Sequence, residues 1–141
     1  MFAALRLRAD VFVVEQDCVY PDLDDKDVQS IHLVAMAENA QPGQPAMATA
    51  RMVPPGVSYA EPSIGRVVSA QSERGGGLGR ELMERAIRIC QRRWPRQAIR
   101  ISAQQYLIRF YEELGFACAG EGYLEDGIPH IEMVRQAENV G

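Results

Sequence analysis

The sequence predicts one α/β domain over residues 1–141, with a mixed sheet, a central strand–helix–strand crossover and helices on both faces. Its length of 141 residues suits a single domain with one core. Segments of β-branched residues alternate with segments that have helical apolar spacing. A turn with four glycines, "RGGGLGR" at 74–80, joins a strand pattern directly to a helix pattern.

The N-terminal third predicts one helix and one hairpin. Residues 3–13, "AALRLRADVFV", are expected to be helical, with a polar, turn-rich stretch after them. Four of their residues share one face at helical spacing: Leu5, Arg8, Ala9 and Phe12. Residues 31–38 and 46–53 are predicted strands, and "NAQPGQP" between them is a loop of the kind that closes a hairpin.

The crossover follows in residues 63–103. A β-branched strand at 63–70 leads into the glycine turn, and an amphipathic helix begins at Leu78 and stops near "RRWP", because proline cannot continue it. Residues 98–103 alternate as the next strand. Since such crossovers are right-handed and join nearby strands, we expect these two strands to be parallel neighbours. Ligands favour the crevice beyond the carboxyl ends of such strands, where the glycine turn lies.

The C-terminal part predicts a second helix and a final strand pair. Residues 106–115, "YLIRFYEELG", have helical spacing, and Gly115 is expected to cap the C-terminus of that helix. Residues 116–125 and 130–135 are predicted to pair across the turn "DGIP".

Composition excludes several classes of protein. The net charge of −4 and the pI of about 5.2 argue against a dedicated nucleic-acid binder. No apolar run approaches the ~20 residues of a membrane span, and the first residues do not form a secretory signal. The three cysteines are an odd number without paired spacing. We therefore expect reduced thiols, a cytoplasmic protein and no zinc site.

The glycine turn fits a phosphate-binding helix start. A P-loop is excluded because Arg80 and Glu81 stand where lysine and a hydroxyl residue are required, and a dinucleotide fingerprint is excluded because Arg80 replaces its last glycine. The pattern R-x-x-G-x-G remains, with Arg74, Gly77 and Gly79. Unbonded N–H groups and the helix dipole attract a pyrophosphate there, and the arginines add charge-assisted bonds. The alternative is a flexible loop that merely tolerates glycine.

Four segments carry a resemblance to a known family: "LRLRADVFVVEQDCVYPDLDDKD", "GRVVSAQSERGGGLGRELMERAI", "QQYLIRFYEELGF" and "YLEDGIPHIEM". With them, the chain resembles GNAT-type N-acyltransferases, and within these the ElaA-like branch, over nearly its whole length. The resemblance implies a GNAT-like fold and acetyl-CoA bound at the R-x-x-G-x-G turn. The implied cofactor-binding residues are Val67, Val68, Arg74, Gly75, Gly76, Gly77, Leu78, Gly79, Arg80 and Gln104.

The resemblance also implies how the acetyl group is handled. A backbone N–H around Val67 and Val68 is expected to polarise the thioester carbonyl, with the pantetheine arm lying along the strand. Tyr111 is the expected acid for the leaving sulfur, against the alternative of an aromatic residue that only packs its helix. Gln104 stands where many members have asparagine, and we expect it to keep a cofactor contact.

The base that deprotonates the acceptor stays open. The candidates are Glu15, His32, Glu125, Asp126 and His130, and a chain of waters that serves several of them is an equal alternative. The expected acceptor is a primary amine on a small molecule or a peptide. A non-catalytic acyl-CoA sensor or partner-binding module on the same fold is the competing hypothesis.

Two further features bear on ligands and partners. The acidic run "PDLDDKD" is no calcium loop, because Asp27 and Leu33 occupy its glycine and glutamate positions. That run is either a negative rim that attracts a cationic amine or a solvated loop. The family usually has another strand before the first helix, whereas this chain starts at "MFAALRLR". Either the sequence is shortened here or the sheet lacks this edge strand, and in the second case the unpaired edge makes a homodimer possible.

Overall fold

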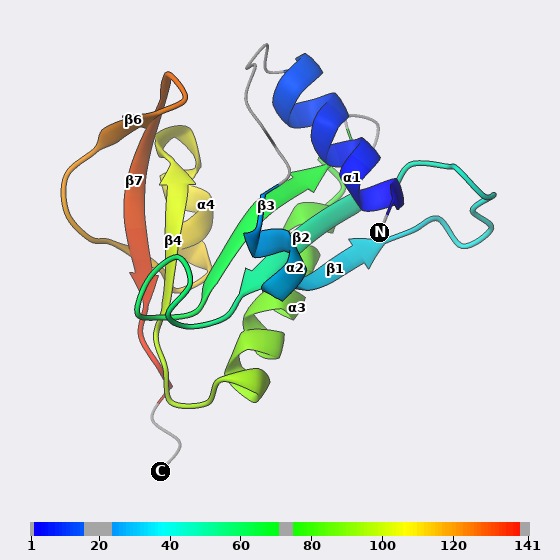
Figure 1. The fold of residues 1–141 in the computed structure, drawn as a ribbon. Coiled ribbons are helices and arrows are strands. Elements are labelled where there is room, and N and C mark those ends of the chain that lie inside the picture. Colours follow the sequence, from blue (N-terminus) through cyan, green and yellow to red (C-terminus); the bar gives the residue numbers. More distant parts are fainter. Residues whose placement is uncertain (1, 16–23, 71–74, 139–141) are drawn as a thin grey trace.

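The computed structural model describes residues 2–15, 24–70 and 75–138 (Figure 1). Helices and strands alternate along the chain in the predicted order. They are α1 (Phe2–Arg8) with a π-helical continuation (Ala9–Glu15), α2 (Lys26–Gln29), β1 (Ile31–Ala35), β2 (Ala48–Val53), β3 (Ser63–Ser69), α3 (Leu78–Arg93), β4 (Ile99–Gln104), a 3₁₀ turn (Gln105–Leu107), α4 (Ile108–Glu113), β5 (Ala117–Cys118), β6 (Tyr123–Glu125) and β7 (Ile128–Arg135). None of these helices is long and apolar enough to cross a membrane.

The strands form two antiparallel sheets that meet at one point. One sheet has the order β1-β2-β3, and in the other β7 pairs with β4, β5 and β6. The N–H of Arg100, at the start of β4, donates to the carbonyl of Pro62, just before β3, at 3.1 Å. From there β3 and β4 run parallel and diverge (Figure 1). The two predicted neighbours therefore meet only at their first residues.

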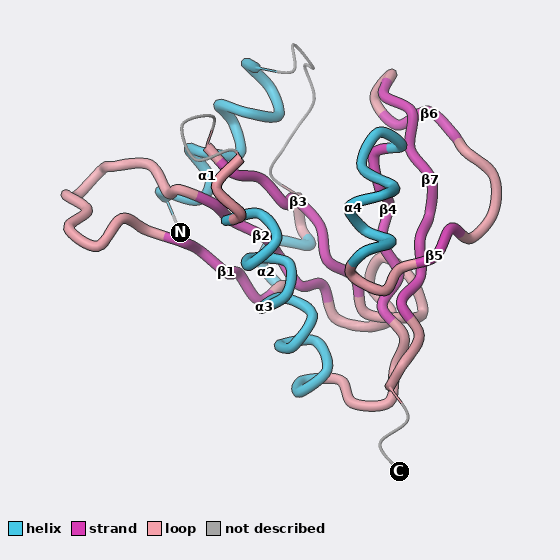
Figure 2. Tube along the Cα trace, turned by 180° about the vertical axis from the view of Figure 1, so that it is seen from behind, coloured by secondary structure: helices cyan, strands magenta, loops and turns pink. Residues whose placement is uncertain are grey.

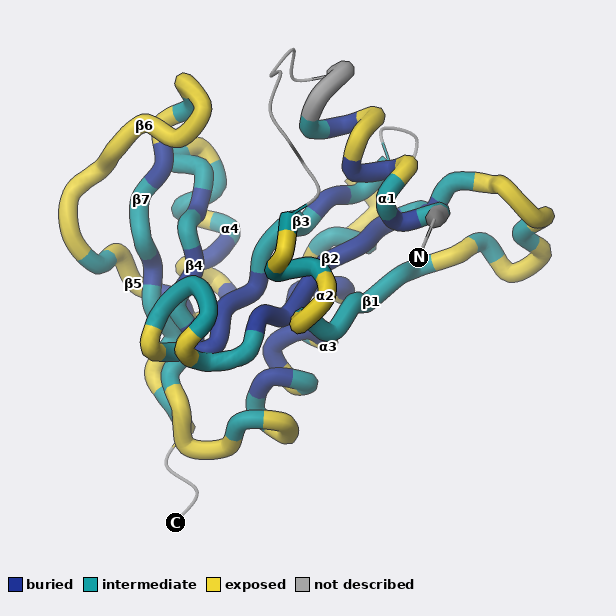
Figure 3. Tube along the Cα trace, viewed as in Figure 1, coloured by how far each residue is buried: buried dark blue, intermediate teal, exposed yellow. Residues whose placement is uncertain are grey.

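Helices cover both faces of this arrangement, as predicted. The helix α1 lies on one face, whereas α3 and α4 lie on the other, as the two opposite views show (Figures 1 and 2). The sheet-facing side of α3 is buried, as expected for an amphipathic helix, and its buried residues are Leu82, Met83, Ala86, Ile87 and Cys90. Burial is concentrated along β2, α3 and the inner side of β4 and β7 (Figure 3).

The predicted buried face of the first helix is wrong by about one residue. Of the four residues expected on it, only Arg8 is buried. The buried set is Ala4, Leu7, Arg8 and Val11. The residue common to both sets, Arg8, is held inside because its guanidinium binds the carboxylate of Asp27. Beyond Arg8 the helix also widens to π-helical geometry, which rotates later side chains away from a 3.6-residue repeat.

A β-bulge interrupts β3 in the middle of the molecule. Thr49 pairs with Val68 and Arg51 with Gly65, so Arg66 and Val67 together oppose a single residue of β2. Arg66 has a φ of 48°, the left-handed conformation that occurs in one class of bulge. Such a bulge disrupts the hydrogen-bond ladder locally and bends the strand. It lies where β3 turns away from β4.

The C-terminal elements follow the prediction with adjusted ends. The second helix starts as the 3₁₀ turn and ends at Glu113, two residues before Gly115, whose φ is 95° and whose N–H donates to the carbonyl of Glu112 at 3.0 Å. The final turn is shorter than "DGIP". Only Asp126 and Gly127 connect β6 to β7, both at positive φ (50° and 78°), as in a two-residue hairpin turn.

Candidate functional site

A cleft of about 380 Å³ lies between the diverging strands β3 and β4. Within the described residues, β3 pairs only with β2 and β4 only with β7, apart from the single bond at their start. The edges of β3 and β4 that face the cleft therefore offer free N–H and C=O groups. An extended ligand arm with amide groups can bind such edges like an additional strand.

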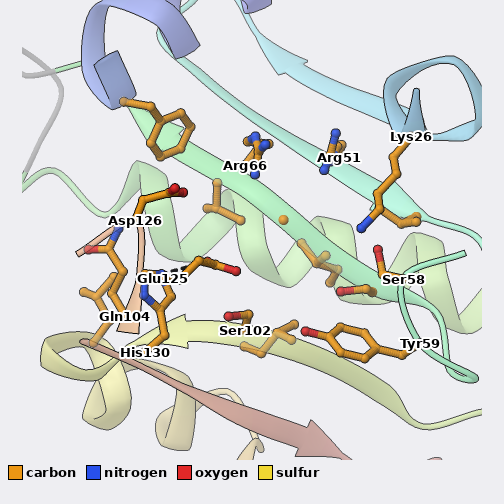
Figure 4. Close-up of a pocket in the computed structure, with 18 of the residues that line it drawn as sticks. Lys26, Arg51, Ser58, Tyr59, Arg66, Ser102, Gln104, Glu125, Asp126 and His130 are labelled. Carbon is orange, nitrogen blue, oxygen red and sulfur yellow. Dashed lines mark ion pairs between the residues drawn. The ribbon is translucent and has the colours of Figure 1, made fainter. Parts of the chain in front are cut away.

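The lining combines backbone and polar side chains from five parts of the chain (Figure 4). Strands β2 and β3 contribute cations and the bulge, β4 contributes polar side chains, and the β6–β7 hairpin contributes an acid–histidine group. The residues used below are Lys26, Arg51, Tyr59, Arg66, Val67, Ser102, Gln104, Tyr111, Glu125, Asp126 and His130.

The predicted phosphate-binding turn is an exposed helix start. Gly77 occupies the N-cap of α3 with a φ of 81°, which only glycine adopts at low cost. Gly79 has no such conformational reason, and a Cβ added there would meet no atom within 4 Å. Its missing side chain therefore serves no packing inside the protein. Arg80 is exposed and pairs with Glu113 at 3.1 Å and Glu84 at 3.4 Å, and Arg74 lies outside the described residues.

A network of arginines and aspartates forms the wall on the β2–β3 side. Arg8, with a side chain only 1% exposed, binds both carboxylate oxygens of Asp27 at 2.7 and 3.2 Å. Arg51 binds both oxygens of Asp24 at 2.7 and 3.2 Å and one oxygen of Asp27 at 3.1 Å. Arg66 approaches Asp24 at 3.6 Å. The network ties α1 to the stretch before α2 and to β2 and β3.

The same network decides what the acidic run does. Burial raises the pKa of Asp27, but hydrogen bonds from Arg8, from the Asp24 backbone and from Arg51 outweigh this and hold the pKa well below its usual range. Burial likewise opposes the pairing of Asp24 with Arg51, and the net effect still lowers the pKa of Asp24. These two carboxylates are bound to arginines, so they do not form the free negative rim that the sequence suggested. Asp25 is exposed, and Asp22 lies outside the described residues.

Tyr111 reaches the cleft from the core. Its side chain is 8% exposed, and its ring packs edge-on against Phe110 and Phe116, with centroids 5.2 and 5.9 Å away. Burial raises the pKa of its hydroxyl to about 12. The residue packs α4 onto the sheet and also lines the cleft, and its role as the acid for the leaving sulfur stays a prediction.

The candidate bases separate into two groups. Glu125, Asp126 and His130 come together at the β6–β7 hairpin and line the cleft. His32 lies on β1, outside the lining, and its Nε2 donates to the carbonyl of Asp27 at 2.8 Å. Glu15 ends the π-helical segment, and its side chain lies outside the described part.

Two hydroxyl residues of the cleft, Tyr59 and Ser102, and the neighbouring Tyr123 were not predicted. Tyr59 follows β2, Ser102 lies on β4 and Tyr123 on β6, and the hydroxyls of Ser102 and Tyr123 form a very short hydrogen bond. Burial and neighbouring acidic groups raise the pKa of Tyr59 to about 12. The alternation of β4 could have indicated Ser102, because it faces away from the buried Ile101 and Ala103. No pattern in the neighbouring sequence indicates that Tyr59 or Tyr123 belongs near the cleft.

Two observations concern metals and thiols. Among the described residues, no three His, Cys, Asp or Glu side chains are grouped closely enough to hold a metal ion. Cys90 is buried, which raises the pKa of its thiol to about 12, and Cys118 is exposed on β5. Cys18 lies outside the described residues.

Comparison with known proteins gives consistent results. The family model described as an acetyltransferase (GNAT) domain matches residues 21–137. A UPF0039 protein of Synechocystis sp. is 42% identical over 134 residues, which cover 95% of this chain and 84% of that protein. The protein ElaA of Escherichia coli is 36% identical over 138 residues, which cover 96% and 87%.

Solved structures agree with this assignment. The crystal structure of an acyl-CoA N-acyltransferase from Pseudomonas aeruginosa superposes with a TM-score of 0.84 at 41% identity, over 95% of this chain and 88% of that one. The crystal structure of Escherichia coli ElaA gives a TM-score of 0.83 at 35% identity, over 96% and 88%. The chain belongs to the GNAT acetyltransferase-domain family, and ElaA and UPF0039 proteins are among its relatives.

Proposed function

We propose that this protein transfers an acetyl group from acetyl-CoA to a primary amine, which attacks the thioester directly. The observation that carries this proposal is the gap between β3 and β4, whose facing edges carry unpaired backbone groups in the described residues. The helix that follows β3 begins with glycines whose absent side chains serve no internal contact. A ligand with an extended amide arm and a pyrophosphate suits both features.

The residues that would hold acetyl-CoA follow from this arrangement. The backbone of β3 around Val67 and Val68 would hold the arm, and Gln104 lines the cleft across from it at the end of β4. The N–H groups at the start of α3 (75–79) would hold the pyrophosphate, with Arg80 beside them. When bound, acetyl-CoA supplies an acetyl group activated as a thioester.

Polarisation of the acetyl carbonyl is assigned to the bulge in β3. The two residues that oppose one on β2, Arg66 and Val67, line the cleft, and the bulge disrupts the hydrogen-bond ladder of β3 there. A backbone N–H there costs no reorganisation when negative charge develops on the carbonyl oxygen. Removing one such preorganised donor typically costs 10²–10³ in rate, so the role can be large without any special side chain.

Tyr111 is assigned to the departing sulfur as a hydrogen-bond donor. Because its pKa is about 12, its hydroxyl stays protonated throughout the neutral range. Complete proton transfer to a thiolate of ordinary pKa, ~8.5, would be uphill by roughly 3–4 pKa units, or about 5 kcal/mol. Tyr111 therefore stabilises the thiolate as it forms, and the thiol takes its proton later.

The acceptor side is the polar half of the cleft. Its walls carry cations on the β2–β3 side and Glu125, Asp126 and His130 on the hairpin side, so an ammonium group is best placed against the hairpin (Figure 4). The volume of about 380 Å³ suits a small amine or the end of a peptide. The odd cysteine count supports a cytoplasmic setting for this reaction.

The test is a screen of primary amines with acetyl-CoA, read as release of the CoA thiol and as the mass of the acetylated product. Accelerated transfer to at least one amine is the expected result. Acetyl-CoA binding without transfer to any amine would instead favour the acyl-CoA sensor.

A further inference from the structure

The imidazole of His130 is held in one tautomer by its own strand. Its Nδ1 lies 2.7 Å from the backbone carbonyl oxygen of Ile128. A carbonyl oxygen only accepts hydrogen bonds, so Nδ1 must carry the proton. In the neutral ring, Nε2 therefore has the free lone pair. The side chain is 8% exposed, and the cleft is the side from which it can be reached.

That lone pair faces a carboxylate. Nε2 lies 3.2 Å from Oε2 of Glu125, across the turn of the β6–β7 hairpin (Figure 4). Two acceptor atoms at this distance repel each other unless a proton lies between them. The neutral ring can therefore accept one proton at Nε2, and the contact with Glu125 then becomes an ion pair. Glu125 is half exposed, with 51% of its side chain accessible, so that proton can leave to solvent.

The ring is fixed from its other sides as well. Tyr123 stacks on it with ring centroids 6.2 Å apart, and the hydroxyl of Tyr123 is bound to Ser102. The backbone carbonyl of His130 accepts a hydrogen bond from Nε2 of Gln105 at 3.0 Å. A Cβ on Gly122 would come within 2.2 Å of that same Gln105 nitrogen, so the glycine leaves room for this bond.

We propose that His130 is the catalytic base for the acceptor amine and that Glu125 is a positioning residue that stabilises the imidazolium. This role rests on the proposed function. The ammonium of the acceptor gives one proton to Nε2, and the freed lone pair forms the bond to the acetyl carbon. The C–S bond then breaks, and its electron pair leaves on sulfur. The nitrogen loses its second proton as the amide forms, which converts the thiolate to the thiol. His130 returns its proton to solvent through Glu125.

Other charged and titratable groups face this pair from several elements. Tyr123 belongs to β6 and Asp126 to the turn. The groups across the cleft are Tyr59, Lys26, Asp24, Arg51 and Arg66. Asp24 is already bound to Arg51, and among the described residues Glu125 is the group within ion-pair distance of the His130 ring.

The second histidine is a built-in control. The chain has two histidines, and Nε2 of His32 donates to a carbonyl, so its neutral ring carries the proton on the opposite nitrogen. Long-range ¹⁵N–¹H spectra of the parent should show one Nδ1–H and one Nε2–H imidazole at high pH. The Nδ1–H signal should vanish in His130→Gln and persist in His32→Gln. An Nε2–H tautomer for His130 would overturn the assignment without any activity measurement.

Kinetics test the catalytic role on the amine that the parent acetylates best. We expect kcat/KM to rise with pH in the parent and in His32→Gln. In His130→Gln this rise should be lost, and the rate should be reduced by about 10²–10⁴. In Glu125→Gln that rise should move to lower pH, because the imidazolium loses the carboxylate that stabilises it. If the parent transfers the acetyl group and His130→Gln does so at a rate within twofold of the parent, the role of His130 is overturned and the proposed function is not. Absence of transfer to every amine would overturn the proposed function and this role with it.

Discussion

Gly79 gives the most direct way to separate cofactor binding from folding. It is the second residue of α3, where glycine costs about 0.5–1 kcal/mol relative to a good helix former. A Cβ at this position meets no atom within 4 Å, so a larger side chain would extend into open space. In the ligand-free protein, Gly79→Leu should therefore raise the free energy of unfolding by up to about that amount, or the Tm by roughly 2–4 °C.

Acetyl-CoA binding should change in the opposite direction. The leucine would occupy the space through which a pyrophosphate approaches the N–H groups at the start of α3. A tenfold weaker Kd corresponds to about 1.4 kcal/mol, and we expect at least that loss. At 100 times the parent's Kd, acetyl-CoA stabilises the parent by about 2.7 kcal/mol, whereas the same concentration stabilises a tenfold weaker variant by only about 1.4 kcal/mol.

Thermal unfolding with and without acetyl-CoA, together with titration calorimetry, measures both effects. Gly79→Ala is the matched control, because it brings the same gain in helix propensity with only one added methyl group. Its binding should lie between that of the parent and that of Gly79→Leu. A Gly79→Leu protein that is more stable and binds acetyl-CoA as tightly as the parent would refute the assignment of α3 to the pyrophosphate.

Two further substitutions test the cleft and its wall. Tyr111→Phe keeps the aromatic packing and should slow transfer about 10–100-fold, which is the equivalent of one hydrogen bond to a charged atom. The affinity for acetyl-CoA, measured by calorimetry, should not change. A transfer rate within twofold of the parent would show that the residue is purely structural. Asp27→Asn should lower the free energy of unfolding by about 3–5 kcal/mol at neutral pH, because it leaves Arg8 charged and buried without its partner. The control is Asp25→Asn at an exposed position, which should change the free energy of unfolding by less than about 0.5 kcal/mol. Since the folded-state pKa of Asp27 is depressed, its stabilisation is present above the unfolded value near ~4 and is lost as the pH falls below it. Denaturant titrations from neutral to acidic pH should show a steeper loss for the parent than for Asp27→Asn, and parallel losses would contradict the pairing.

Local patterns were sufficient for most of the element order. The apolar spacing of α3 identified its buried face, and Gly115 was identified as a C-terminal cap because glycine tolerates the left-handed conformation it has there. The glycine turn was placed correctly at the start of α3. These features depend on a few neighbouring residues, which a sequence displays directly.

Features that depend on distant residues were not predictable in the same way. The burial of Arg8 depends on Asp27, 19 positions away, and no local pattern in the first helix indicates that partner. The divergence of β3 and β4 could not be predicted from the alternation of apolar and polar residues in either strand. His130 and Glu125 were candidates among five, and only the carbonyl of Ile128 singles out which ring nitrogen faces the carboxylate.

The central claim is that the gap between β3 and β4 holds acetyl-CoA. A crystal structure of the protein with acetyl-CoA tests it most directly. The arm is expected between these two strands, with the acetyl carbonyl accepting a hydrogen bond from a β3 N–H at the Arg66–Val67 bulge and the pyrophosphate at the start of α3. An arm bound outside this gap, or a pyrophosphate held away from residues 75–80, would contradict it.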